Sequence, residues 1–172
     1  MEKINQLRKL LKYYNIDGYI VPKNDEFFGE YIPSNKDKLK FISNFSGSYG
    51  FALILKNKNY LFVDGRYTLQ AKIQSEQFFK IITIPNKTPS DVLKKKKLKI
   101  GFDPKLYTQK VLKMFFFKTN CKLISIRQNL IDKLWSNRSL EIQQKFYVLP
   151  KKAVGKSDKF KINLLINKLN KK

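Results

Sequence analysis

The order of apolar and polar positions predicts helices that alternate with short strands. Residues 2–14 carry their apolar side chains on one helical stripe, which predicts an amphipathic opening helix with Ile4, Leu7, Leu10, Leu11 and Tyr14 on its inner face. The apolar run 19–21, closed by Pro22, is typical of a short buried strand. The chain thus opens as a helix followed by a strand.

The middle of the chain predicts a hairpin. The apolar runs 51–55 and 60–63 are separated only by the polar residues 56–59, so the two strands should pair antiparallel. After Asp64 and Gly65 the apolar period becomes helical until about residue 76, and residues 79–84 are strand-like again.

The remaining elements follow the same alternation. Further helices are expected at 37–42, from 88–91 onward, at 108–118 and at 129–135, and further strands at 99–102 and 122–126. Six short strands alternating with helices, with one adjacent pair forming a hairpin, predict an α/β fold with a mixed six-stranded sheet flanked by helices.

The end of the chain does not fit that unit. We expect a first domain at 1–138, a polar linker at 139–145, and at 146–172 the truncated beginning of a second α/β unit. Residues 146–149 read as a strand, and a helical stripe follows at Ile162, Leu165, Ile166 and Leu169. One strand and one helix cannot bury each other's faces, so this helix is expected to dock on the first domain or on a partner unless more chain follows.

The large positive charge of the chain does not by itself indicate a nucleic-acid-binding protein. The chain has 36 Lys and Arg residues against 13 Asp and Glu, a net charge of +23, which invites a nucleic-acid hypothesis. Only four of these cations are arginines, and the lysines are spread along the whole chain, with one true run at 94–97. We therefore expect no specific nucleic-acid partner, only weak, salt-sensitive attraction to acidic surfaces.

Missing residue types exclude several classes of chemistry. The chain has no histidine, which excludes Ser-His-Asp, Cys-His and histidine–metal sites within it. The single Cys121 cannot form an internal disulfide.

No apolar run approaches the roughly 18–20 residues of a membrane span, and the first residues do not form a secretory signal, so a cytoplasmic protein without membrane contact is expected.

Five sequence blocks resemble a known family. They are EYIP (30–33), FISNFSGSYGFALIL (41–55), VDGRYTLQA (63–71), IGFDP (100–104) and NLIDKLWSNR (129–138). In order and spacing they are similar to the first domain of cytosolic-type Xaa-Pro aminopeptidases (aminopeptidase P), in the creatinase and prolidase family. The resemblance covers about residues 2–138 and implies a creatinase N-terminal fold of ribonuclease H-like architecture.

The resemblance also implies what this chain lacks. The family's last domain has a pita-bread fold and holds two divalent metals, manganese by expectation, with Asp, His and Glu ligands. No segment here matches that domain, so the resemblance implies a chain truncated before the catalytic domain, with no catalytic or metal-binding residue of its own and inactive alone. Residues 146–172 resemble the beginning of the family's second domain.

Arg66, in the DGRY block, is the one candidate site residue. Spacing alone favours a simple turn in which Asp64-Gly65 ends a strand and Arg66-Tyr67 opens a helix. The resemblance instead assigns this arginine to substrate binding, a role that suits the fixed charge and forked donors of a guanidinium. Arg66 would then contact a peptide only when a catalytic domain is assembled beside it.

The glycine-rich block FSGSYG has a simpler reading. It lacks the Gly-Lys-Ser/Thr ending of a phosphate-binding loop, so we interpret it as a turn in which the backbone passes closely into the following strand. Members of the family commonly have a small residue where this chain has Tyr49.

Several functions remain open from sequence. The leading interpretation is the non-catalytic N-terminal domain of a metal-dependent Xaa-Pro aminopeptidase, contributing substrate-entrance and oligomer contacts. Its expected partners are a second copy in a homodimer or a separately encoded catalytic domain. The alternatives are a free-standing dimerisation or interaction module, the product of a decaying gene and, less favoured, a basic nucleic-acid-binding protein.

Overall fold

The computed structural model describes residues 2–139 and 145–170, and the chain divides into two units, Met1–Leu140 and Glu141–Lys172. The linker predicted at 139–145 lies almost entirely outside the described residues. The sheet lies in the first unit.

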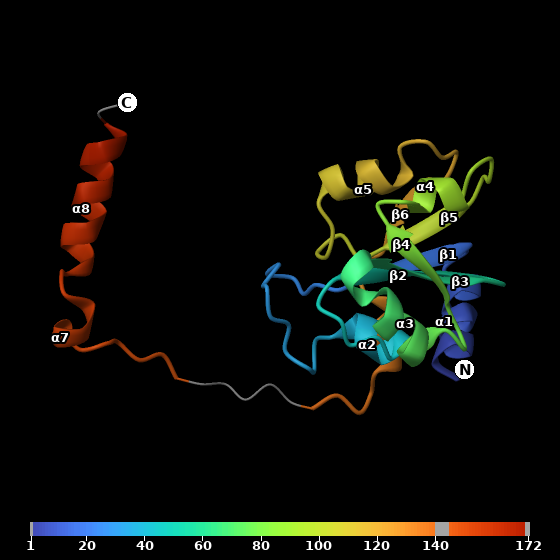
Figure 1. Cartoon of the computed structure of the whole chain (residues 1–172), viewed down its shortest axis with the longest axis horizontal. Helices are drawn as coiled ribbons and strands as arrows, with labels where there is room; N and C mark the ends of the chain where they lie inside the picture. The colour runs from blue at the N-terminus through green and yellow to red at the C-terminus, as the bar shows by residue number, and fades with distance from the viewer. Residues whose placement is uncertain (1, 140–144, 171–172) are drawn as a thin grey trace. The chain divides into compact units, whose positions relative to one another are not determined.

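The sheet of the first unit has six strands in the order β4-β3-β2-β1-β5-β6 (Figure 1). Its strands are β1 (Gly18–Pro22), β2 (Gly50–Leu55), β3 (Asn59–Asp64), β4 (Lys80–Ile84), β5 (Lys99–Phe102) and β6 (Lys122–Ser125). β2 runs antiparallel to both of its neighbours, β1 and β3, whereas β1–β5, β5–β6 and β3–β4 are parallel pairs. The prediction of a mixed six-stranded sheet with a hairpin is confirmed.

The central strands are buried on both faces. Tyr19 and Val21 of β1 pack into one core, while Ile20 between them packs into the other. Alternate side chains of a strand point to opposite faces, so a strand covered on both sides becomes a continuous apolar run. This is why the strands are legible in the sequence as uninterrupted apolar stretches.

Helices form a layer on each face of the sheet (Figure 1). One core receives side chains from α1 (Glu2–Tyr13), α2 (Lys38–Ser43), α3 (Thr68–Ser75) and α6 (Leu130–Leu134). The other receives them from α5 (Gln109–Phe116) and from the end of α4 (Pro89–Val92), where Leu93 is fully buried. The first unit is thus a three-layer α/β/α sandwich.

Side-chain caps fix where the short helices begin. The Asp37 carboxylate accepts the backbone N–H of Lys40 at the start of α2, and the Asn129 side chain accepts that of Ile131 at the start of α6. Thr88 and Asp91 form a capping box on α4. Such caps satisfy backbone donors that the helix itself leaves free.

The second unit contains two helices among its described residues, α7 (Lys151–Val154) and α8 (Asp158–Leu169). The predicted helix is confirmed, with the Ser157 hydroxyl accepting the N–H of Phe160 at its start. The strand predicted at 146–149 is wrong, because these residues adopt no regular structure and Phe146, Tyr147 and Val148 are exposed. A strand needs a neighbouring strand for its backbone groups, and the described residues of this unit offer none.

Candidate functional site at the carboxyl edge of the sheet

Strand direction gathers the candidate residues at one edge of the sheet. Only β2 is reversed, so the carboxyl ends of the other five strands lie at the same edge. The segments that leave this edge carry Lys23 after β1, Arg66 after β3, Pro85 after β4, Asp103 after β5 and Arg127 after β6. In open α/β sheets, ligands bind outside the carboxyl ends of the strands. This edge is therefore the candidate functional site.

Arg66 lies in the short 3-10 helix η1 (Gly65–Tyr67), directly after β3. Its Nε lies 3.0 Å from Asp64 Oδ1, and its Nη2 lies 2.9 Å from Asp64 Oδ2, so the two side chains form a forked ion pair. The backbone N–H of Arg66 also donates to Asp64 Oδ1 at 2.8 Å. The Arg66 side chain is 73% exposed, so the pair fixes its orientation and leaves donors open to solvent.

The ion pair changes the protonation behaviour of both groups. Hydrogen bonds from the Arg66 side chain and backbone lower the pKa of the Asp64 carboxyl below its ordinary value. The same carboxylate raises the pKa of the Arg66 guanidinium. Both groups therefore remain charged over the whole neutral range.

The glycine-rich loop 44–50 packs against the turn that carries Arg66. The Ser48 hydroxyl lies 2.6 Å from the hydroxyl of Tyr67, and the rings of Phe45 and Tyr67 meet edge to face at 5.9 Å. A Cβ placed on Gly47 would lie 2.3 Å from Phe45 Cζ and 2.9 Å from Tyr67 Cδ1. The prediction of a close backbone passage is confirmed, because only glycine fits here without displacing a ring.

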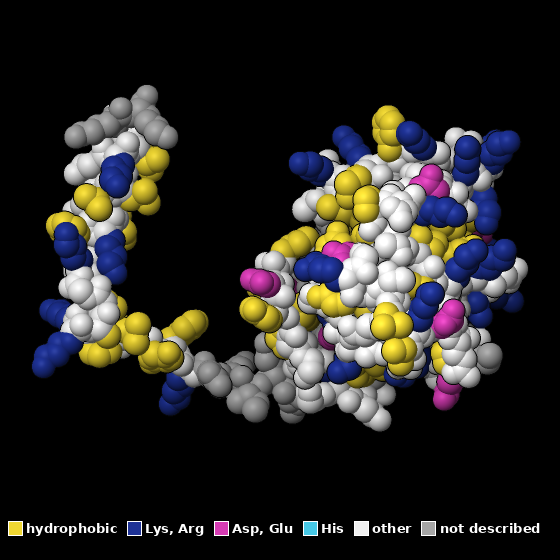
Figure 2. All heavy atoms as spheres, viewed as in Figure 1, with side chains coloured by type: hydrophobic (Ala, Val, Ile, Leu, Met, Phe, Trp, Pro, Cys, Tyr) yellow, Lys and Arg dark blue, Asp and Glu magenta, His cyan; other side chains and the backbone are white. Residues whose placement is uncertain are grey.

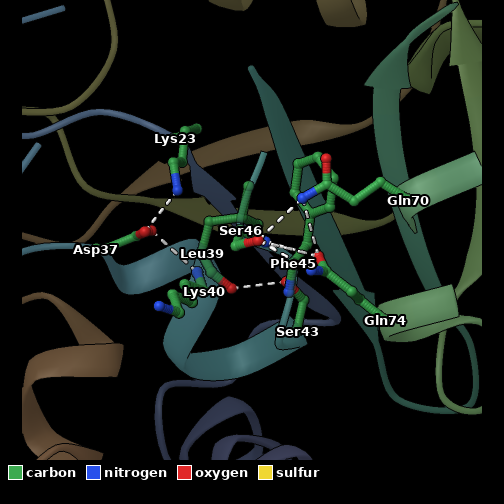
Figure 3. Close-up of polar contacts among 9 residues, drawn as sticks. All are labelled: Lys23, Asp37, Leu39, Lys40, Ser43, Phe45, Ser46, Gln70 and Gln74. Carbon is green, nitrogen blue, oxygen red and sulfur yellow. Dashed lines mark hydrogen bonds and ion pairs between the residues drawn. The ribbon is translucent and has the colours of Figure 1, made fainter. Parts of the chain in front are cut away.

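A second set of contacts ties the same loop to α3 (Figure 3). The Ser46 hydroxyl accepts hydrogen bonds from Gln70 Nε2 and from Gln74 Nε2, each at 2.9 Å, and the Ser46 N–H donates to Gln74 Oε1 at 2.9 Å. The FSGSYG and DGRY blocks, which the sequence shows as separate motifs, therefore form one structural unit. That unit fixes the turn from which the Arg66 side chain projects.

A mostly apolar groove lies beside Asp64. It has a volume of about 380 Å³, and its lining includes Tyr49, Ile84, Pro85, Met114 and Phe115. Asp64 is part of its lining, so the groove adjoins the carboxylate that orients Arg66. Such a combination suits a ligand with both a polar and an apolar group.

The sequence singled out Arg66 but not the groove. Tyr49, Pro85 and Met114 come from three distant segments that sheet order and α5 bring together. No local motif marks them. Tyr49, the residue that departs from the family pattern, is 49% exposed and lines the groove, so its ring is accommodated at the surface.

The block at 129–138 has a structural role, as its apolar residues indicate. Leu130 and Ile131 are fully buried, and the Trp135 ring stacks on Phe41 with centroids 4.6 Å apart. The described residues contain no group of three or more Cys, Asp or Glu side chains that could hold a metal, and the chain has no histidine. The side chains present at this edge therefore do not fit a metal centre.

Comparison with known proteins agrees with this architecture. The family model described as Creatinase/Prolidase N-terminal domain matches residues 3–134. A probable Xaa-Pro aminopeptidase P of Laccaria bicolor is 34% identical over 182 residues, covering 99% of this chain and 28% of that protein. The chain thus spans little more than a quarter of this curated relative.

Solved structures also match this chain over most of its length. X-prolyl aminopeptidase from Caenorhabditis elegans, described as a cytosolic enzyme with a di-nuclear active site, superposes with a TM-score of 0.84 at 28% identity, covering 99% of this chain and 31% of that one. The N-terminal domain of the peptidase PepQ from Mycobacterium tuberculosis shares the fold, with a TM-score of 0.59 at 18% identity and coverage of 77% and 98%. The chain belongs to the Creatinase/Prolidase N-terminal domain family and matches the N-terminal domain of Xaa-Pro aminopeptidases.

Proposed function

We propose that this chain is the non-catalytic, substrate-entrance domain of a metal-dependent Xaa-Pro aminopeptidase. The observation that carries the proposal is Arg66, an exposed guanidinium oriented by Asp64 at the carboxyl edge of the sheet. In this role Arg66 donates to a carbonyl or carboxylate of the peptide. The adjacent groove takes an apolar side chain of the same peptide.

The chemistry then belongs to a catalytic domain outside the residues that match the N-terminal domain. Two divalent metals, manganese by expectation, would be held there, and the residues described here would only bind and orient the peptide. The protein would act in the cytoplasm. In support, no helix within 2–139 or 145–170 has the length and apolar character that crossing a bilayer requires, and the C. elegans relative is described as cytosolic.

The first test is an activity assay of the purified chain. With an Xaa-Pro peptide and Mn²⁺ we expect no turnover, because no described cluster of side chains can activate water with a metal. Turnover that co-purifies with the chain would contradict the non-catalytic assignment.

The second test isolates Arg66 in an assembled enzyme. The chain replaces the matching portion of the C. elegans enzyme, and the chimera is assayed with and without Arg66→Gln. Loss of a charge-assisted hydrogen bond to substrate is expected to raise KM about tenfold, with a smaller change in kcat. Arg127→Gln is the matched control, because Arg127 is also an exposed arginine at this edge. Equal KM values for the parent and Arg66→Gln chimeras would remove Arg66 from the substrate site.

The apolar face of α8 supports an association with the catalytic domain, from the same or another chain. Ile162, Leu165, Ile166 and Leu169 lie at helical spacing and are 46–63% exposed. The curated relative extends over more than three times the matched length, so additional polypeptide is available in such proteins to cover this face. A homodimer through α8 is the alternative assembly.

Light scattering separates the two assemblies. We expect a monomer for the chain alone and a one-to-one complex when the remaining portion of the C. elegans enzyme is added. Leu165→Glu should abolish the complex, whereas Asn167→Glu on the other side of α8 should not. A stable dimer of the chain alone would favour homodimerisation instead.

A further inference from the structure

A second cavity lies at the same edge of the sheet, among the parallel strands β1, β5 and β6. It has a volume of about 170 Å³ and is lined by the segments that follow β1, β5 and β6, the start of α2, α6 with its N-cap, and Arg138. None of the groove residues beside Asp64 lines it. It is therefore a site separate from Arg66.

The cavity is rich in positive charge. Five Lys or Arg side chains line it against three Asp or Glu side chains, an excess of two positive charges. Asp132 contacts two of these cations. Its Oδ1 lies 3.6 Å from Lys38 Nζ and also accepts a hydrogen bond from the guanidinium of Arg138. One carboxylate thus balances two cations.

Lys38 has the most buried side chain of these five cations. Its side chain is only 6% exposed, and 3.6 Å is too long for a strong hydrogen bond to Asp132. An ammonium on so buried a side chain gains from a well-placed anionic partner. An anion in the cavity would supply a closer partner than Asp132 does.

The cations at the rim are also unsatisfied. In the part of the chain that the structure describes, neither the Arg127 guanidinium nor the Lys105 ammonium has a hydrogen-bond or ion-pair partner, and both side chains line the cavity. Asp103 does not neutralise them. Its Oδ2 accepts Asn129 Nδ2 at 2.8 Å, and its Oδ1 accepts the backbone N–H of Lys105 at 2.9 Å.

The size of the cavity restricts what it could bind. Pockets for drug-sized ligands have volumes of about 300–1,000 Å³, so a cavity roughly half the lower limit suits a small ion or a single charged group. Two excess positive charges and a guanidinium match an oxyanion that carries more than one negative charge.

We propose that this cavity binds a phosphate group, either as the free ion or attached to a small molecule or peptide. Lys38 contacts the group from the buried side, and Arg127 and Lys105 contact it from the rim. The proposal is independent of the aminopeptidase assignment, because it uses neither Arg66 nor a catalytic domain.

Calorimetric titration of the full chain with inorganic phosphate tests it, at constant ionic strength set with chloride. We expect saturable binding of one phosphate per chain, weakened about tenfold by Arg127→Gln and further by the double variant with Lys105→Gln. Both positions are exposed, so these variants leave the Lys38–Asp132 contact and the fold intact.

Matched controls separate a built site from the general attraction of a +23 chain. Arg66→Gln, and the double variant Lys9→Gln/Lys72→Gln, remove the same charges elsewhere and should leave the affinity unchanged. An equal loss in these controls, non-saturable binding or no heat of binding would overturn the proposal. A phosphoserine peptide as a second probe identifies the source: tighter binding than inorganic phosphate indicates an attached group, and weaker binding a free ion.

Discussion

At the scale of single residues, Arg66 is defined by its partner Asp64. The two are only two positions apart, and the carboxylate both begins η1 and orients the guanidinium. The sequence suggests Asp64 as a turn residue and Arg66 as a candidate contact, but it does not show that one holds the other. That relation depends on the geometry of η1.

The Asp64–Arg66 pair predicts a titration. The carboxyl of Asp64 should titrate below an ordinary aspartate, whose pKa is about 3.9, because its ionised form is favoured by Arg66. In Arg66→Gln that pKa should move up toward the ordinary value, since the side-chain hydrogen bond is the largest cause of the shift. Carboxyl-carbon NMR measures both, with Arg127→Gln as the variant that should leave Asp64 unchanged.

Gly47 lies where an added side chain would clash with the Phe45 ring. Gly47→Ala places a methyl group 2.3 Å from the Phe45 ring, so we expect a loss of about 1–3 kcal/mol in the free energy of unfolding. Gly65→Ala is the control, because its nearest neighbour would be Thr83 Cγ2 at 4.0 Å. Urea denaturation of the two variants should give a lower midpoint for Gly47→Ala alone, and similar midpoints would show that the loop adjusts freely.

At the scale of elements, the strands and helices of the first unit were predictable for an identifiable reason. Burial on both faces turns β1, β2 and β3 into unbroken apolar runs, and side-chain caps such as Asp37 and Asn129 mark helix starts. The strand predicted at 146–149 failed because an apolar run becomes a strand only beside another strand. Groove residues such as Met114 could not be predicted, because sheet order and not local sequence brings them to Asp64.

Asp17 joins three of these elements at the amino end of β1. Its Oδ1 accepts Lys56 Nζ at 2.5 Å, from the turn between β2 and β3. Its Oδ2 accepts the backbone N–H of Lys99, the first residue of β5, at 2.8 Å. These bonds, the one to Lys56 first, lower the pKa of the Asp17 carboxyl.

Asp17→Asn should therefore lower the free energy of unfolding by about 1–2 kcal/mol at neutral pH, the low end for hydrogen bonds to a charged group, because Asp17 is partly exposed. The folded-state pKa is depressed, so this stabilisation is complete above the ordinary aspartate pKa of about 3.9 and is lost as pH falls through the folded-state value. The difference between parent and variant should shrink below about pH 4. Glu76→Gln, an exposed acid, should show no comparable difference at any pH.

At the scale of the whole molecule, the cations that give the charge of +23 are distributed along the whole chain. On the face shown in Figure 2, Lys and Arg side chains are scattered among polar and hydrophobic ones and are interrupted by Asp and Glu. A nucleic-acid reader instead concentrates its cations on one face or along one helix. The net charge therefore predicts attraction to nucleic acids without recognition of their base sequence.

That attraction can be tested with duplex DNA. Binding that rests only on neutralised phosphates falls steeply with salt, by factors of about 10³–10⁵ between 50 and 200 mM when six to ten phosphates are contacted. We expect retention of labelled DNA at low salt, loss of retention near physiological salt, and equal affinity for unrelated sequences. Lys9→Gln and Lys72→Gln should weaken low-salt binding to the same small extent, because each removes one exposed charge from a diffuse field. Sequence preference at physiological salt, or a much larger loss from one of the two variants, would instead reveal a dedicated nucleic-acid surface.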